Sequence, residues 1–150
     1  MTLNNEDRLF PTTEKTRGLS RSLYSSIKDL PILSPHGHCE PSWFSKNIRF
    51  PDPAQLFVVP DHYVFRMLVS QGFRLNELGV NSIDGSNFEK DPREIWKRFS
   101  ENYYLFRGTP TAMWLDYSFE KVFGITEPLT PATADFYYNH IEEKLSQPEY

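Results

Sequence analysis

One predicted β-strand among many predicted helices most constrains the fold of this 150-residue chain. The apolar run Leu30-Pro31-Ile32-Leu33 leads into Pro35-His36-Gly37-His38, and we expect a strand near residues 31–38. A lone strand has no pairing partner, and its backbone polar groups would be unsatisfied if it were buried. The strand therefore predicts either pairing with a sheet elsewhere or a chain that is the front portion of a longer α/β polypeptide. A (β/α)8 barrel, which needs about 250 residues, fits the second possibility.

Helix signals occupy most of the remaining sequence. Leu19, Leu23 and Ile27 recur every four residues and predict an amphipathic helix over residues 14–28 whose apolar stripe packs inward. Later helix starts are expected where proline stands next to a residue suited to a helix N-terminus. These starts are Glu40-Pro41, Asp52-Pro53, Pro60-Asp61, Asp91-Pro92, Thr109-Pro110 and Thr130-Pro131.

Helix ends and faces can also be assigned. Gly72 and Gly124 are placed to end helices in the left-handed conformation, and the polar segment 79–91 predicts a loop. The last helix carries one apolar face before Gln147-Pro148 ends it. That face consists of Ala134, Tyr137, Ile141 and Leu145.

Composition excludes several classes of protein. A hydrophobic fraction of 39% indicates a folded chain. The 16 basic and 20 acidic residues give a net charge of -4, and the sequence contains no basic patch of the kind that binding to nucleic acid or to an anionic membrane would require. The sequence lacks the roughly 18 consecutive apolar residues of a membrane-spanning helix. A single cysteine, Cys39, and an N-terminus without signal-peptide features predict a cytoplasmic protein.

His36 and His38 are the candidate metal ligands. In an extended strand the two-residue repeat turns both imidazoles to the same side, where they can bind one cation. Two ligands are fewer than a catalytic zinc-type site uses, so others must come from elsewhere in the fold. Cys39 would face the other way and is interpreted as a packing residue. A pair of half-exposed histidines beside a turn is the alternative.

The second candidate site is Asp61-His62-Tyr63-Val64-Phe65-Arg66. It combines an imidazole, a phenol and a guanidinium within a short length of helix, a set suited to acid–base chemistry and to binding a carboxylate. In the alternative interpretation, Asp61 belongs to the first helical turn, Tyr63 packs and Arg66 is solvated.

The other aromatic residues and His140 are interpreted structurally. Helical spacing favours core or interface packing for the aromatic set, and His140 is expected at the surface. The set is Trp96, Phe99, Tyr103, Tyr104, Phe106, Trp114, Tyr117, Phe119 and Phe123.

Several motifs together resemble a known family. In order, Pro35-His36-Gly37-His38, Asp61-His62-Tyr63-x-x-Arg66-Met67, Phe123-Gly124-Ile125 and Leu129-x-x-x-Thr133-Ala134 resemble the N-terminal part of uronate isomerases, the glucuronate isomerases of the amidohydrolase superfamily. The resemblance runs from about Leu30 to Leu145. The chain departs from the common pattern at Met113-Trp114, where a histidine often precedes the tryptophan, and at Leu68, where an arginine is common.

This resemblance implies a fold and a set of site residues. Residues 1–40 would contain the leading helix and the first strand of a (β/α)8 barrel, and residues 41–150 a helical insertion that covers the active site. His36 and His38 would bind a divalent metal, with zinc the expected ion. His62 and Tyr63 would contact the sugar acid at the reacting carbons, with Arg66 in a supporting or substrate-facing position. The family's remaining site residues, an aspartate from the last strand and carboxylate-binding arginines, would lie beyond Tyr150.

The implied reaction interconverts aldose and ketose hexuronates, D-glucuronate with D-fructuronate and D-galacturonate with D-tagaturonate. It moves a proton from C2 to C1 and therefore needs an acid, a base and stabilisation of developing oxygen charge. We expect the 150 residues alone to be inactive, and the full-length enzyme to be a homo-oligomer. Two alternatives remain: a metal-dependent hydrolase of the same superfamily, and a non-catalytic helical module whose aromatic helices bind a partner.

Overall fold

A computed structural model describes residues 3–34, 36–37 and 40–147. The chain forms two compact units, one of Asn4–Gly37 and one of His38–Tyr150 together with Met1–Leu3. Within the described residues, no helix combines the length and the apolar character needed to cross a lipid bilayer.

The smaller unit contains helix α1, Glu14–Ile27, where the sequence predicts a helix over residues 14–28. The prediction that its apolar stripe packs inward is wrong, since Leu19 and Leu23 are each 63% exposed. The helix contacts the segment before it through Arg21, which binds the Asp7 carboxylate and lies 4.9 Å from the centre of the Phe10 ring, and through Tyr24, whose ring centre lies 6.0 Å from that of Phe10. Among the described residues of this unit no side chain is buried, so the stripe of α1 has no core here to pack against.

The predicted strand near residues 31–38 is absent from the described part of that segment, residues 31–34 and 36–37. The Ser34 hydroxyl instead donates a local hydrogen bond to the His36 carbonyl oxygen at 2.7 Å. A strand requires a neighbouring strand to pair its backbone groups, and none occurs among the described residues. His38 lies outside them.

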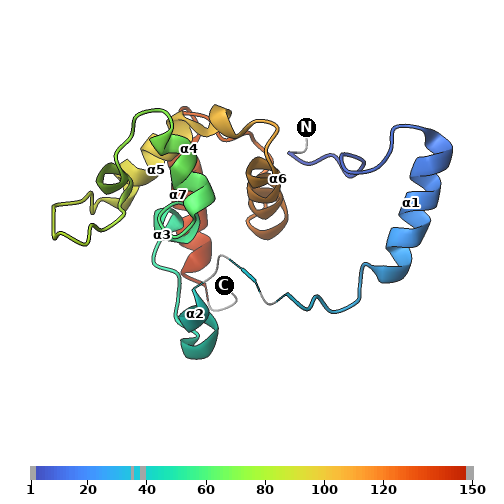
Figure 1. The fold of residues 1–150 in the computed structure, drawn as a ribbon, viewed down its shortest axis with the longest axis horizontal. Helices are drawn as coiled ribbons and strands as arrows, with labels where there is room; N and C mark the ends of the chain where they lie inside the picture. The colour runs from blue at the N-terminus through green and yellow to red at the C-terminus, as the bar shows by residue number, and fades with distance from the viewer. Residues whose placement is uncertain (1–2, 35, 38–39, 148–150) are drawn as a thin grey trace. The chain divides into compact units, whose positions relative to one another are not determined.

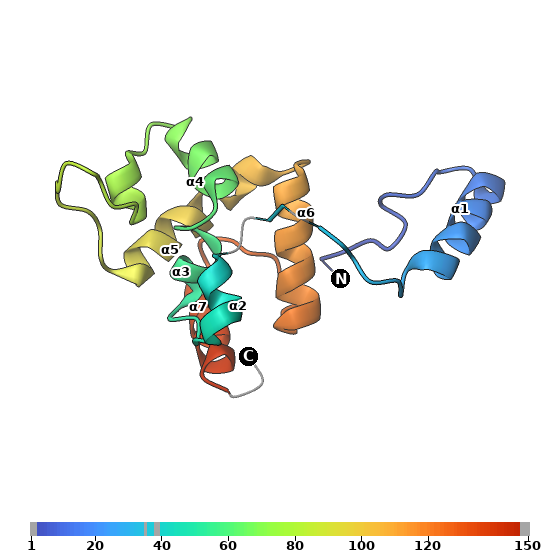
Figure 2. The ribbon, with the colours of Figure 1, turned by 60° about the horizontal axis from the view of Figure 1, so that its bottom comes forward.

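The larger unit is built from short helices. α5 packs against both α3 and α7 (Figure 1), and α6 continues directly into η3 (Figure 2). The elements are α2 (Pro41–Lys46), α3 (Pro53–Phe57), α4 (His62–Val69), the 3₁₀ helices η1 (Leu75–Leu78) and η2 (Tyr103–Phe106), α5 (Pro92–Glu101), α6 (Pro110–Tyr117), the π-helix η3 (Ser118–Val122) and α7 (Ala134–Leu145).

The predicted capping residues explain where most of these helices begin. Asp52, Asp91 and Thr109 each accept a hydrogen bond from a backbone N–H of the first turn that follows, at 2.9, 2.9 and 3.2 Å. The predicted start at Thr130-Pro131 is wrong by one turn, because α7 begins at Ala134. The Thr133 hydroxyl donates to the Pro128 carbonyl at 2.8 Å and accepts from the Thr130 N–H at 2.9 Å, which holds residues 130–133 in a turn before the helix.

Aromatic side chains fill the core between these helices. Trp96, 1% exposed, donates its indole N–H to the Ala134 carbonyl at 3.0 Å and so joins α5 to the start of α7. Its ring centre lies 5.3 Å from that of Phe99 and 6.3 Å from that of Phe119. The predicted apolar face of α7 is buried as expected.

The structure differs from the predicted exposure of three side chains. His140 is half-buried, and its Nε2 lies 2.7 Å from the Phe123 carbonyl oxygen, so it links α7 to the end of η3 rather than being a simple surface residue. Helical spacing predicts a core or interface position for Tyr104 and Tyr117, and the structure excludes the core, since they are 58% and 57% exposed. Aromatic spacing shows that a residue belongs to a helix face, but the neighbouring helices decide whether that face is covered.

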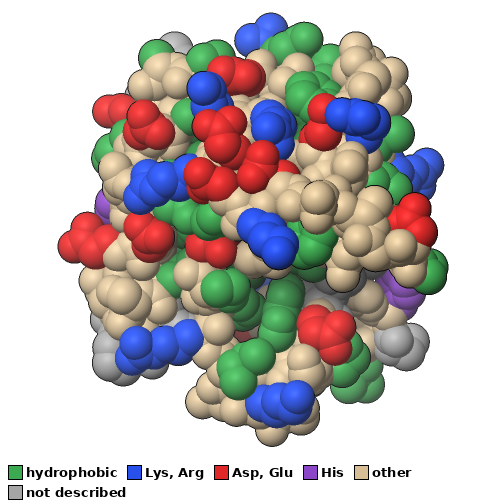
Figure 3. Space-filling model, turned by 90° about the vertical axis from the view of Figure 1, so that its left-hand side faces the viewer, with side chains coloured by type: hydrophobic (Ala, Val, Ile, Leu, Met, Phe, Trp, Pro, Cys, Tyr) green, Lys and Arg blue, Asp and Glu red, His purple; other side chains and the backbone are tan. Residues whose placement is uncertain are grey.

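The loop over residues 79–91 follows η1 and is tied to α5. Gly79 begins it at φ +80°, a left-handed conformation that favours glycine, and a Cβ at this position would lie 2.5 Å from Cδ1 of Ile95 and displace that side chain. The Arg98 guanidinium donates to the Glu77 carbonyl oxygen and to the Glu89 carboxylate. Figure 3 shows acidic and basic side chains interspersed on one face of the molecule, with several acidic side chains adjoining one another near its upper middle.

Candidate functional site

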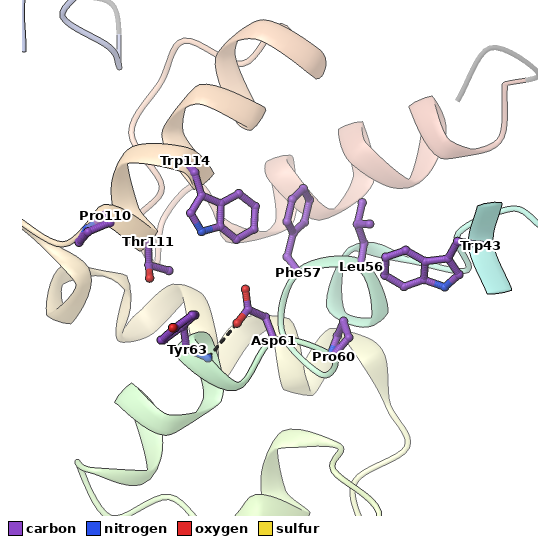
Figure 4. A pocket seen from close by; sticks show the side chains of 9 residues that line it. All are labelled: Trp43, Leu56, Phe57, Pro60, Asp61, Tyr63, Pro110, Thr111 and Trp114. Carbon is purple, nitrogen blue, oxygen red and sulfur yellow. Dashed lines mark hydrogen bonds between the residues drawn. The ribbon is translucent and has the colours of Figure 1, made fainter. Parts of the chain in front are cut away.

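The first turn of α4 presents the predicted site residues. The Asp61 carboxylate accepts a hydrogen bond from the Tyr63 N–H at 2.8 Å and caps the helix (Figure 4). Val64 and Leu68, one turn apart, are fully buried and fix this helix on the core. This attachment leaves His62 and Tyr63 on the outward side of α4.

Tyr63 lines an apolar pocket of about 650 Å³, a size typical of small-molecule sites. The walls come from α2, from α3 with the turn after it, from the first turn of α4 and from the first two turns of α6. In Figure 4, Tyr63 from α4 and Trp114 from α6 approach the pocket from different sides, with Asp61 beside Tyr63. The lining residues are Trp43, Leu56, Phe57, Pro60, Asp61, Tyr63, Pro110, Thr111 and Trp114.

Of the predicted catalytic and substrate-binding residues, only Tyr63 is among the side chains that line this pocket. His62 is exposed, and its ring stacks on the Tyr63 ring with centroids 4.5 Å apart. Arg66 is also exposed and lies one helical turn beyond His62. The structure therefore brings His62 and Tyr63 together, while the predicted contact of Arg66 with a substrate stays a prediction.

The predicted metal ligands are only partly described. His36 is exposed in the smaller unit, and His38 lies outside the described residues. Where the structure describes the chain, no three His, Cys, Asp or Glu side chains are grouped to hold a metal ion. Imidazole is a suitable ligand for zinc, but a complete site needs more ligands than these two histidines supply.

Part of the pocket wall does not follow from the sequence. Helical spacing predicts that Trp114 packs in a core or an interface, yet it is 38% exposed and lines the pocket with Thr111. The predicted helix start at Thr109-Pro110 would have placed Thr111 and Trp114 on one helix face, since they are three residues apart. No sequence signal indicated that α4 would lie opposite this face.

Comparison with known proteins assigns the chain to a family. A family model described as glucuronate isomerase matches residues 6–150. The chain belongs to the glucuronate isomerase family. The motif resemblance in the sequence is thereby confirmed over nearly the whole chain.

Individual relatives agree with this assignment. The chain is 57% identical over 148 residues to a uronate isomerase of Rhizobium meliloti, a match that covers 99% of this chain and 32% of the relative. Its fold matches the crystal structure of a glucuronate isomerase from Caulobacter crescentus with a TM-score of 0.90 at 49% identity, covering 99% of this chain and 31% of that one. A uronate isomerase from Thermotoga maritima matches with a TM-score of 0.72 at 26% identity, covering 97% and 29% of the two chains.

The chain thus spans about a third of the length of the curated relatives it matches. Family membership favours an isomerase over the metal-dependent hydrolase and the binding module that the sequence analysis left open.

Proposed function

We propose that this chain is the N-terminal portion of an enzyme that interconverts aldose and ketose hexuronates. The substrate pairs are D-glucuronate with D-fructuronate and D-galacturonate with D-tagaturonate. Family membership supports the reaction class. The observation that carries the proposal is that Tyr63, paired with His62, lines a pocket of ligand size in a chain of this family.

The reaction needs a group that carries protons at the reacting carbons. A proton leaves C2 as the O2 hydroxyl becomes a carbonyl, and a proton is added to C1 as the O1 carbonyl becomes a hydroxyl. We assign the carbon-to-carbon transfer to Tyr63, whose phenolate would take the C2 proton and return it to C1 while the O2 hydroxyl proton passes to O1, because this side chain reaches the pocket and His62 does not line it. The His62 ring, stacked on Tyr63, would orient the phenol. Tyr63 would contact the substrate from the pocket wall, and the proposed contact of His62 with the substrate would lie at the pocket edge, because His62 is exposed and does not line the pocket.

The proposed fold places these residues in a larger architecture. Residues 31–38 would form the first strand of a metal-dependent (β/α)8 barrel of the amidohydrolase superfamily, within the leading segment 1–40. Residues 41–150 would be the helical insertion over the active site. The unpaired state of the described part of residues 31–38 agrees with a strand whose neighbours lie outside this chain.

His36 and His38 are the proposed ligands of a divalent metal, with zinc as the expected ion. A bound divalent cation supplies Lewis-acid stabilisation of negative charge on the sugar oxygens. Arg66 is a proposed substrate-facing or supporting residue. We also propose that the full-length enzyme is a homo-oligomer and that it is cytoplasmic. The single cysteine of the chain agrees with a reducing compartment.

A chimeric enzyme tests the reaction. This chain would replace the matching segment of the Rhizobium meliloti uronate isomerase, to which it is 57% identical. We expect the chimera to convert D-glucuronate to D-fructuronate in an NMR assay, and the isolated 150 residues to show no turnover. A folded chimera without turnover would contradict the proposed function.

Substitution of Tyr63 tests its role in the same chimera. Tyr63→Phe should lower kcat by about 10²-fold or more, because loss of a proton-transferring group typically has an effect of this size. Tyr104→Phe is the matched control, since Tyr104 is similarly exposed but lies outside the pocket lining. Equal kcat values for the two variants would exclude Tyr63 as the proton carrier.

Zinc content should fall when His36 and His38 are both replaced by alanine.

A further inference from the structure

Trp114 differs from the core aromatic residues near it. It is 38% exposed, while Phe57 and Phe119 are at most 4% exposed. It lies one turn after Pro110 at the start of α6, and Pro110, Thr111 and Trp114 all line the pocket. The exposed part of this large aromatic side chain therefore belongs to a concave wall rather than to an open surface.

The core holds the Trp114 ring in place. The ring centre of Trp114 lies 6.1 Å from that of Phe57, with the two planes inclined by 36°. Phe57 in turn packs against Phe119 at 5.4 Å and Phe123 at 5.9 Å. One flank of the indole is thus supported by buried aromatic residues, and Figure 4 shows the indole extending from α6 toward the pocket, between Phe57 and Thr111.

The charge of the wall limits how a sugar acid can lie against it. Among the described side chains that line the pocket, Asp61 is the one with a formal charge, and it is an anion. Its carboxylate would repel a hexuronate carboxylate placed in the pocket. The apolar wall favours the C–H groups of a sugar instead, because they lose little hydration when they are buried against an aromatic ring.

We propose that Trp114 is a substrate-binding residue whose indole contacts the C–H face of the hexuronate, with the substrate carboxylate directed away from this wall. The proposal rests on the proposed function, and it adds a residue that the proton-transfer chemistry does not require. Trp114 would contribute equally to ground-state and transition-state binding, because the C–H face it contacts does not gain charge during the reaction.

The test uses the chimeric enzyme described above. Trp114→Ala should raise KM for D-glucuronate by about ten-fold with little change in kcat, the pattern expected when uniform binding is removed. Trp114→Phe retains a flat aromatic face and should raise KM much less. Tyr117→Ala is the control, because Tyr117 lies on the same helix, is 57% exposed and is not among the residues that line the pocket.

The possible outcomes separate the two proposals. An inactive wild-type chimera overturns the proposed function itself. An active chimera in which Trp114→Ala leaves KM unchanged overturns the role of Trp114 alone. If Trp114→Ala does not fold, Trp114→Leu replaces it, since leucine retains apolar bulk without a flat face. A KM of Trp114→Leu well above that of Trp114→Phe supports the proposal. Equal KM values for Trp114→Leu and Trp114→Phe refute it.

Discussion

Replacement of Trp96 by phenylalanine should destabilise the larger unit markedly. Trp96 is 1% exposed and contacts both α5 and α7 neighbours in the core. Its indole N–H donates to the Ala134 carbonyl at 3.0 Å, a hydrogen bond between residues 38 positions apart in the sequence. Trp96→Phe removes this hydrogen bond and one ring of a tightly packed side chain, and leaves the aromatic character of the site unchanged.

The expected loss in the free energy of unfolding is the sum of these two effects. Loss of the hydrogen bond should cost only about 1 kcal/mol. The Ala134 carbonyl is not left unsatisfied in the variant, because it lies in the first turn of α7 and can still accept from the helix backbone. Complete truncation of a buried tryptophan costs about 3–5 kcal/mol, so loss of one ring should cost about 1–2 kcal/mol. The total of about 2–3 kcal/mol corresponds to a decrease in Tm of about 8–12 °C for a unit of this size.

Thermal and urea unfolding of the 150-residue chain, followed by far-UV circular dichroism, measures this effect. Trp114→Phe is the matched control, because Trp114 is 38% exposed and its replacement should cost less than about 1 kcal/mol. Equal losses for the two variants would show that Trp96 does not join α5 to α7 as the structure indicates.

Two further predictions concern buried and bridging charges. Burial raises the pKa of Asp52 above its ordinary value of 3.8, so the folded state binds its proton more tightly and gains stability as the pH falls through the raised pKa. Asp52→Asn retains a capping oxygen but cannot ionise, so it should be more stable than the wild type at neutral pH. In denaturant titrations the difference in stability should disappear below pH 3.8. A wild type that is more stable than Asp52→Asn at neutral pH would refute this prediction. Arg98→Ala should increase the rate of limited proteolysis within residues 79–91, because Arg98 binds the Glu89 carboxylate at 3.1 Å. Lys97→Ala is the control and should leave the rate unchanged. Equal cleavage rates for the two variants would show that Arg98 does not hold the loop.

The sequence by itself determined most of the helix boundaries and the candidate chemistry. Asp52, Asp91 and Thr109 cap helices because each needs only a backbone N–H a few residues away, so the signal is complete within one turn. The motif order that resembles the glucuronate isomerases was likewise visible without any structure. Thr130 shows the limit of such local signals, since a neighbouring threonine hydroxyl, at Thr133, holds the turn and delays the helix.

Only the tertiary structure decided which side chains share the pocket. Trp43, Tyr63 and Trp114 come from three separate helices, and their meeting depends on how α2, α4 and α6 are arranged around the pocket. Helical spacing alone could not distinguish Trp114, which is exposed to the pocket, from Trp96, which is buried. The physical reason is that burial depends on contacts between distant segments, whereas caps and helical periodicity depend on neighbours within a few residues.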